Sequence, residues 1–201
     1  LRGPISTTTK VDFRNVKSVI DANDNGPDIS GASLLVASTG DLGTTGNMLE
    51  TSLGSVEATA TRGIFFDNNR ALTIGGVSTT ASGLVAGGAV SVIGNLLLAV
   101  TENVTGNGPV NLEAIDGPDP VANQIKLSAG VKIESTTSDL ALRSGDVFSF
   151  ATGNKLIANQ GSGQITIATD WKNADPGVGG TFTLPTKAAN IFSANRLQII
   201  G

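Results

Sequence analysis

The sequence lacks several residue types on which common protein chemistry depends. It has no Cys and no His among its 201 residues. This excludes disulfides, thiolate metal sites and histidine-based metal binding or acid–base catalysis. It also has no Tyr, a single Trp and an aromatic content of only 4%. A hydrophobic core must therefore be built mainly from Val, Ile, Leu and Ala, which suits a narrow β-sheet interior.

Charge and long apolar runs are scarce as well. Charged residues make up 15% of the chain and the net charge is −4, with the 13 basic residues scattered along it. We therefore expect no nucleic-acid partner, because binding a phosphate backbone requires clustered Lys and Arg. No apolar run approaches the roughly 18 residues that a membrane span needs. The chain begins with Leu1 rather than Met, so we expect a segment of a longer protein or a processed product.

The abundant apolar, small polar and glycine residues form a short repeated sequence motif, called the phrase, that recurs along the chain. In ALTIGGV (71–77) and AVSVIG (89–94), two apolar residues flank a small polar one and glycine follows. This alternation has the period of a β-strand, with one dry face and one wet face. Between the phrases, GNG, DGPDP, GSG and DPGVGG supply turn residues. The phrases begin at Leu72, Val90, Val110, Ile125, Leu140, Ile165, Phe182 and Leu197.

The repetition predicts an all-β fold with stacked coils. The gaps between phrases, 15 to 25 residues, average about one coil of a β-solenoid. We expect a parallel β-helix of about nine or ten irregular coils, roughly 45 to 50 Å long. An antiparallel sandwich is the rival fold, but the phrases resemble one another in sequence and aromatic residues are scarce, and both features favour the solenoid. The best helical candidate, residues 48–60, contains Gly54 and four Thr or Ser residues, which disfavour a helix.

The chain divides into two parts. Residues 1–30 contain the strand-like VDF and KSVI but weaker repeats, and form either a capping coil or a continuing coil. Residues 31–201 carry the β-solenoid repeats. Asparagine is frequent near the turns, and in stacked coils like amides can form ladders along the axis.

Three runs carry a resemblance to a known family. They are MLETSLGSVEATATRGIFFDNNRALTIGGV, VSVIGNLLLAVTENVTGNGPVNLEA and ITIATDWKNADPGVGGTFTL. Their style of repeat resembles that of large bacterial surface proteins related to filamentous haemagglutinin-type adhesins, over approximately residues 19–184. The resemblance implies a right-handed parallel β-helix, exported to the bacterial cell surface as a stalk, adhesin or matrix fibre. It supplies no catalytic residues. DGPDPVANQ (116–124) departs from the pattern as an insertion between phrases.

The segment VIDANDNGPDIS contains a candidate calcium loop. It matches the opening D-x-[DN]-x-[DN]-G of an EF-hand from Asp21 to Gly26, but the twelfth position is Ala32 instead of the bidentate Glu. The same letters resemble the DxNDNxP linker of cadherins. Two interpretations stay open: a structural turn, or a calcium site. The ligands of such a site would be Asp21, Asn23, Asp24, Asn25 and Asp28.

Other acidic turns are interpreted as solvated. Asp116 with Asp119, and Asp170 with Asp175, could bind a cation or form an acid–base pair, but their Gly and Pro neighbours favour solvated turns. A glycosidase needs paired carboxylates within a groove that is usually lined by aromatics, and Trp171 is the only Trp. There is no GxSxG and no phosphate-binding loop motif.

These observations predict an extracellular structural protein, a stiff β-solenoid segment of a bacterial surface adhesin or fibre, and not an enzyme. Its partners would be another copy, the continuation of a longer chain, or carbohydrate or protein of a host surface or matrix. The alternatives are a calcium-dependent adhesion module and a polysaccharide-processing β-helix enzyme. No cofactor is expected unless calcium is bound.

Overall fold

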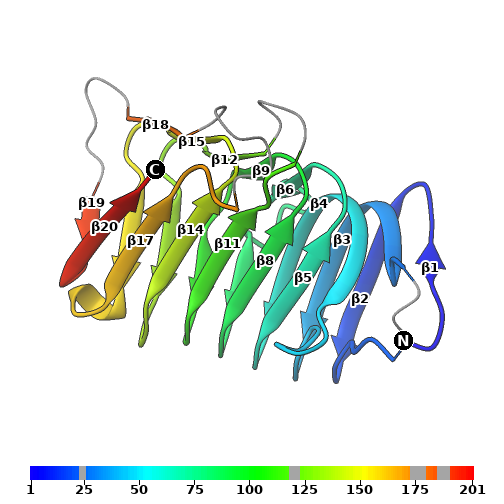
Figure 1. Cartoon of the computed structure of the whole chain (residues 1–201). Coiled ribbons are helices and arrows are strands. Elements are labelled where there is room, and N and C mark those ends of the chain that lie inside the picture. Colours follow the sequence, from blue (N-terminus) through cyan, green and yellow to red (C-terminus); the bar gives the residue numbers. More distant parts are fainter. Residues whose placement is uncertain (23–25, 118–122, 173–179, 185–190) are drawn as a thin grey trace.

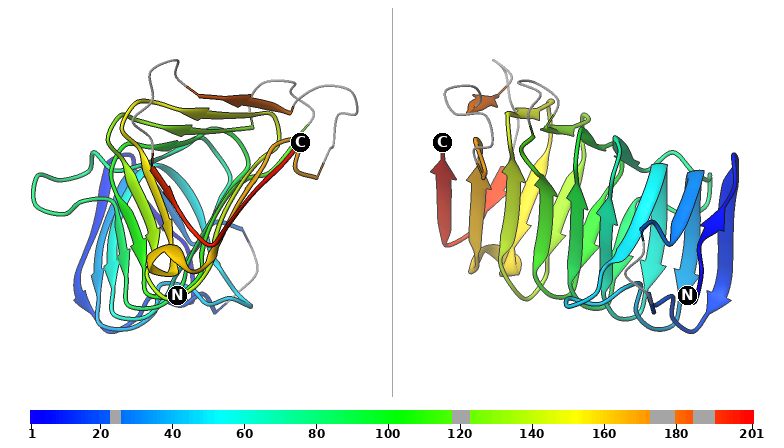
Figure 2. Two further views of the ribbon diagram at one scale, coloured as in Figure 1. Left: turned by 90° about the vertical axis from the view of Figure 1, so that its left-hand side faces the viewer. Right: turned by 45° about the vertical axis from the view of Figure 1, so that its right-hand side comes forward.

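The computed structural model describes residues 1–22, 26–117, 123–172, 180–184 and 191–201. Its strands join into one continuous sheet that winds around itself (Figure 1). All strand pairs of the described residues are parallel. Viewed along the stack, successive coils superpose (Figure 2). The chain is a parallel β-helix, as the sequence predicts.

The continuous sheet bends into three walls, which are called the first, second and third sheets. Each full coil contributes one strand to each of them. The first sheet contains β5 (Ile64–Asn68), β8 (Val90–Gly94), β11 (Val110–Ala114), β14 (Leu140–Ser144), β17 (Gln164–Ala168) and β20 (Arg196–Ile200). The second contains β6 (Leu72–Ile74), β9 (Leu98–Val100), β12 (Gln124–Leu127), β15 (Val147–Phe150) and β18 (Thr181–Thr183). The third contains β7 (Leu84–Ala86), β10 (Val104–Gly106), β13 (Lys132–Ser135), β16 (Lys155–Ala158) and β19 (Ile191–Ser193).

Longer strands form the N-terminal coils. They are β1 (Ile5–Ser6), β2 (Lys10–Val16), β3 (Ile29–Ser38) and β4 (Leu49–Ala60). β4 bends through all three walls, because it pairs with β5 at Leu49, with β6 at Ser55 and with β7 at Ala58. The stretch that offered the best helical candidate is therefore a strand. β1 and β2 both pair in parallel with β3, so they form the outermost coil of the same stack.

The first sheet shows the height of the stack. Within the described residues it has nine rungs, from β1, β3 and β4 through β5 to β20, which agrees with the expected number of coils. At about 4.8 Å per rung, nine rungs span about 40 Å.

The interpretation of the phrase spacing as coil length was wrong. Val110 and Ile125 lie in β11 and β12 of one coil, so the phrases mix strands of the first two sheets. The strands of the third sheet carry a weaker pattern and were missed. Measured within the first sheet, a coil takes between 17 residues, from Leu49 to Phe66, and 32 residues, from Ile165 to Leu197.

Apolar side chains fill the interior as columns in register. In the first sheet, Val90, Val110, Leu140 and Ile165 lie directly above one another, and each is at most 1% exposed. Every second residue of these strands points inward, as the period-two pattern predicts. Each rung therefore buries its apolar pair only because a rung lies on either side.

The core differs from the expectation near its C-terminal end, where phenylalanines replace small aliphatic residues. The ring centroids of Phe148 and Phe150 lie 4.8 Å apart. Phe182 and Phe192 approach Phe150 edge-on, each at 5.6 Å. An aromatic cluster therefore joins the second and third sheets in the last coils.

Buried asparagine amides close some corners between sheets. Asn68, at the end of β5, is fully buried; its Oδ1 accepts from the backbone N–H of Leu53 at 2.8 Å, and its Nδ2 donates to the carbonyl of Arg70 at 2.7 Å. The Nδ2 of Asn154 donates to the carbonyl of Ser128 at 2.6 Å. The row of Asn68 continues with Thr51 on one side and Gly94 on the other, so Asn68 is not part of an amide ladder.

Helical structure is minimal. Apart from strands, the described residues form one short 3-10 helix, η1 (Asn159–Gly161). No helix within the described ranges is long and apolar enough to cross a membrane.

Replacing Asn68 with Ala tests the corner amide. We expect Asn68→Ala to lower the free energy of unfolding by about 2–4 kcal/mol, because buried backbone groups lose their partners. Asn69→Ala is the matched control, since Asn69 is exposed and its loss should cost little. Urea denaturation followed by circular dichroism measures both, and equal stabilities would contradict the role of Asn68.

Candidate functional site

Asp28 of the candidate calcium loop directly precedes β3, an interior strand of the first sheet. Asp21 and Asp28 are buried, at 4% and 1% exposure. The other three predicted ligands, Asn23, Asp24 and Asn25, lie outside the described residues. The structure therefore brings together two of the five predicted residues, Asp21 and Asp28, which are close enough for Asp21 to raise the pKa of Asp28.

Asp28 is fixed between two other coils. Its backbone N–H donates to the carbonyl of Glu50 at 2.7 Å, and the backbone N–H of Glu50 donates to Oδ2 of Asp28 at 3.2 Å. On the opposite side, the backbone N–H of Ile5 donates to the carbonyl of Asp28 at 2.8 Å. The carboxyl group is therefore held in place by the stacked backbone.

The two carboxyl groups favour a shared proton. Burial raises the pKa of Asp28 to about 6, and the hydrogen bond with Asp21 and the charge of Asp21 act in the same direction. The backbone N–H of Glu50 and the amino terminus lower that pKa by less. Above pH 6, two negative charges lie together out of water, an arrangement that a nearby cation would stabilise.

A cleft of about 190 Å³ opens beside this loop. Its walls are formed by Gly26, Pro27, Glu50, Thr51, Asp67, Asn69 and Asn95. Glu50 and Asp67 occupy the same row of adjacent rungs. Carboxylate and amide oxygens on one wall suit a hard cation or a ligand rich in hydroxyl groups. Within the described part of the chain, however, no three Asp or Glu residues are grouped so as to hold a metal ion.

The acidic row continues toward the C-terminal coils and meets a cation there. Burial raises the pKa of Asp67; the Lys172 ammonium lowers it and the Glu113 carboxylate raises it. Glu113 is 5% exposed and forms an ion pair with Lys172, whose Nζ lies 2.6 Å from Oε1 of Glu113. Lys172 therefore offsets part of the negative charge of this row.

Arg143 follows Glu113 in the same row. Its guanidinium lies over the Trp171 ring, 4.8 Å from the centroid, and donates to Oδ1 of Asn111. The backbone N–H of Trp171 donates to the carbonyl of Ser144 at 3.0 Å. The row is therefore acidic near β4 and cationic and aromatic near β14.

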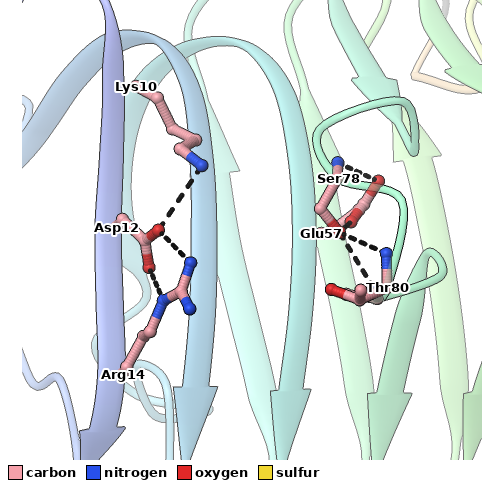
Figure 3. A network of polar contacts seen from close by, with 7 residues as sticks. Lys10, Asp12, Arg14, Glu57, Ser78 and Thr80 are labelled. Carbon is pink, nitrogen blue, oxygen red and sulfur yellow. Dashed lines mark hydrogen bonds and ion pairs between the residues drawn. The ribbon is translucent and has the colours of Figure 1, made fainter.

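A second feature, not found from the sequence, is the loop between β6 and β7. Glu57 is fully buried; its Oε1 accepts from the backbone N–H groups of Val77 and Ser78 at 2.6 and 3.0 Å, and its Oε2 accepts from the Ser78 hydroxyl at 2.7 Å (Figure 3). At the end of the loop, Glu102 accepts from the N–H of Gly83 at 2.6 Å. Two carboxylates thus hold the loop against the wall.

The loop borders an apolar hollow of about 250 Å³. The hollow is lined by Phe13, Arg14, Leu35, Val36, Ala37, Thr59, Thr80 and Ala81. A glutamate within a strand carries no sequence signal for such an anchor. The sequence does indicate the loop itself, through the Gly75–Gly76 pair and the Ser- and Thr-rich stretch STTAS.

The remaining acidic turns contribute one described residue per pair. The interpretation of Asp116 as a solvated turn residue was wrong: its side chain is buried, at 7% exposure, and its Oδ1 accepts from the backbone N–H of Gly117 at 3.0 Å. Asp170 adopts a left-handed backbone conformation with φ of 56°, as expected of a turn. Their predicted mates, Asp119 and Asp175, lie outside the described residues.

Comparison with known proteins finds no relative. No protein-family model, curated protein sequence or solved structure matches the chain.

The variant Asp28→Asn tests the carboxyl pair. A folded-state pKa of about 6 against 3.8 unfolded means that the folded chain binds more protons, so this pair loses stability as the pH rises from about 4 to about 6. The stability of Asp28→Asn relative to the unmodified chain should therefore increase over that interval by about 2–3 kcal/mol. Urea denaturation at pH 4, 5, 6 and 7 measures the difference, and a difference independent of pH would contradict the raised pKa.

Proposed function

We propose that the chain is an extracellular structural protein, a stiff β-solenoid segment of a bacterial surface adhesin or fibre, without enzymatic activity. The observation that carries this proposal is the unbroken parallel stack of the first sheet, from β1 to β20. The apolar columns and the backbone ladder repeat along the axis, so every coil stiffens the next. A stiff fold of this kind holds the side chains of its outer wall at a fixed distance from the surface to which the protein is attached.

The wall is suited to contact rather than to chemistry. Negative charge lies in the row of carboxylates beside the 190 Å³ cleft. Positive charge lies farther along the stack, where Arg143 contacts Trp171. Carbohydrate or protein of a host surface or matrix would meet this pattern of groups. The natural continuations at the ends are further β-coils, from a longer polypeptide or from a second copy.

Immunogold electron microscopy of the cells that make the protein tests the proposed location. Antibodies raised against the folded 201-residue chain should label elongated structures on intact cells, with no increase in labelling after the cells are opened. Labelling confined to opened cells would overturn the proposal.

A second candidate, a calcium-dependent adhesion module, is favoured by the buried Asp21–Asp28 contact beside the acidic cleft. Above pH 6 both carboxyls are ionised and would bind a hard cation through oxygen. A ligand that binds only the folded state raises its melting temperature.

The melting temperature in calcium and in chelator tests this candidate. At pH 7.5, millimolar calcium should raise the melting temperature by several degrees over chelator, and Asp28→Asn should abolish the increase. At pH 5 the increase should be smaller because protons compete for Asp28. Identical melts in calcium and chelator at pH 7.5 would remove the candidate.

A further inference from the structure

A hollow of about 320 Å³ lies on the outer face of the first sheet, over β11 and β14. β11 is paired with β8 and β14, and β14 is paired with β11 and β17, so both strands lie within the stack. The polar residues that line the hollow are Asn111, Ser138, Asp139 and Arg143. The hollow is therefore a polar feature of the lateral wall.

The middle of the hollow is open because a small side chain occupies it. Asp139, Ala141 and Arg143 alternate along one extended segment, so all three side chains belong to the outer face. Ala141 lies opposite Asn111 of the neighbouring rung. At about 3.3 Å per residue, Asp139 and Arg143 stand roughly 13 Å apart along the strand. A ligand that lies across Ala141 therefore meets a carboxylate at one end and a guanidinium at the other.

The guanidinium of Arg143 is fixed in position, but its charge is not neutralised. Its Nη1 donates to Oδ1 of Asn111, and the group lies 4.8 Å from the centroid of the Trp171 ring. Both contacts are with uncharged side chains. Glu113, the next residue in the same row, forms its ion pair with Lys172 instead. Among the described residues, Arg143 takes part in no ion pair.

A carboxylate is the ligand group that fits this guanidinium. A guanidinium has five N–H donors, of which Asn111 accepts one. The remaining donors allow the bidentate pairing with a carboxylate that arginine forms best. Because the group is already oriented by Asn111 and Trp171, little side-chain freedom is lost when a ligand binds.

Hydroxyl groups are the ligand groups that fit the other end of the hollow. Asp139 is exposed, and its Oδ1 accepts from the backbone N–H of Gln164 at 2.8 Å, which fixes the carboxylate. A carboxylate accepts hydrogen bonds from hydroxyl groups and repels a second carboxylate. The hollow thus suits a molecule with one carboxylate near Arg143 and hydroxyl groups near Asp139.

We infer that this hollow binds an acidic saccharide, with the carboxylate of a sialic acid or uronic acid residue on Arg143 and sugar hydroxyl groups on Asp139. The inference rests on the proposed function, in which the outer wall meets carbohydrate, and it adds the class of carbohydrate and the residues that recognise it. Peptide partners are usually anchored by a large side chain in an apolar pocket, whereas charged groups flank the small Ala141 here.

Intrinsic fluorescence tests the binding directly. Trp171 is the only Trp and the chain has no Tyr, so the emission reports the surroundings of Arg143. The acidic probes are sialyllactose and a hyaluronan tetrasaccharide, and their neutral counterparts are lactose and the methyl ester of the tetrasaccharide. At least one acidic probe should change the emission saturably and bind at least about tenfold more tightly than its counterpart. The acidic probe that binds identifies the source of the carboxylate.

Three variants locate the site, and isothermal titration calorimetry measures them because Arg143→Gln itself alters the surroundings of Trp171. Arg143→Gln should weaken binding of the acidic probe at least about tenfold. Ala141→Leu fills the hollow and should also weaken binding, although both charged groups remain. Lys126→Gln is the matched control: Lys126 is an exposed cation of β12 in the second sheet, and its loss should leave the affinity unchanged. Circular dichroism confirms that the variants fold.

Several results would overturn the inference. They are no binding of either acidic probe at millimolar concentration, equal affinity for the acidic and neutral probes, an affinity unchanged by Arg143→Gln, an equal loss in Lys126→Gln, or equally tight binding of a tetraglutamate peptide. Surface labelling in the immunogold experiment without saccharide binding would leave the proposed function standing and remove only this site. Saccharide binding with labelling confined to opened cells would do the reverse.

Discussion

Parallel stacking in register is the constraint on which the rest of this structure depends. Each strand of the first sheet satisfies its backbone groups and its inward apolar pair through the rungs directly above and below. Contacts therefore run mainly between neighbouring coils, and stability accumulates rung by rung. The interior coils are equivalent in this respect.

The strand pattern was readable from the sequence because its period is local. Val90 and Val92 around Ser91 form β8 as predicted, and the glycine and Thr/Ser content of residues 48–60 correctly disfavoured a helix. The length of a coil could not be predicted from the sequence pattern. Val110 and Ile125 carry similar phrases although they belong to different walls of one coil. In β10, whose sequence is VTG, a glycine stands where the phrase has its second apolar residue.

The candidate site was readable only where it is continuous in the sequence. Asp21 and Asp28 lie seven residues apart, so a loop motif could associate them. Glu50 and Asp67 face the same cleft because β4 and β5 pair in a particular register, and no local pattern states that register. The anchoring of the loop between β6 and β7 by Glu57 has the same origin, since its partners Val77 and Ser78 are about one coil away.

Differences in coil length are confined to the corners. Coils of 20 and 26 residues are equally in register in the first sheet, because the additional residues lie in the loop between β6 and β7 while the strands keep their places. Insertions at a corner are consequently a tolerated form of sequence change in this protein. Loss of one residue from the middle of a strand is not, since it would turn the remaining inward side chains of that rung toward solvent. Evolution can thus lengthen or shorten the corner loops of this molecule while its three walls of stacked strands stay the same.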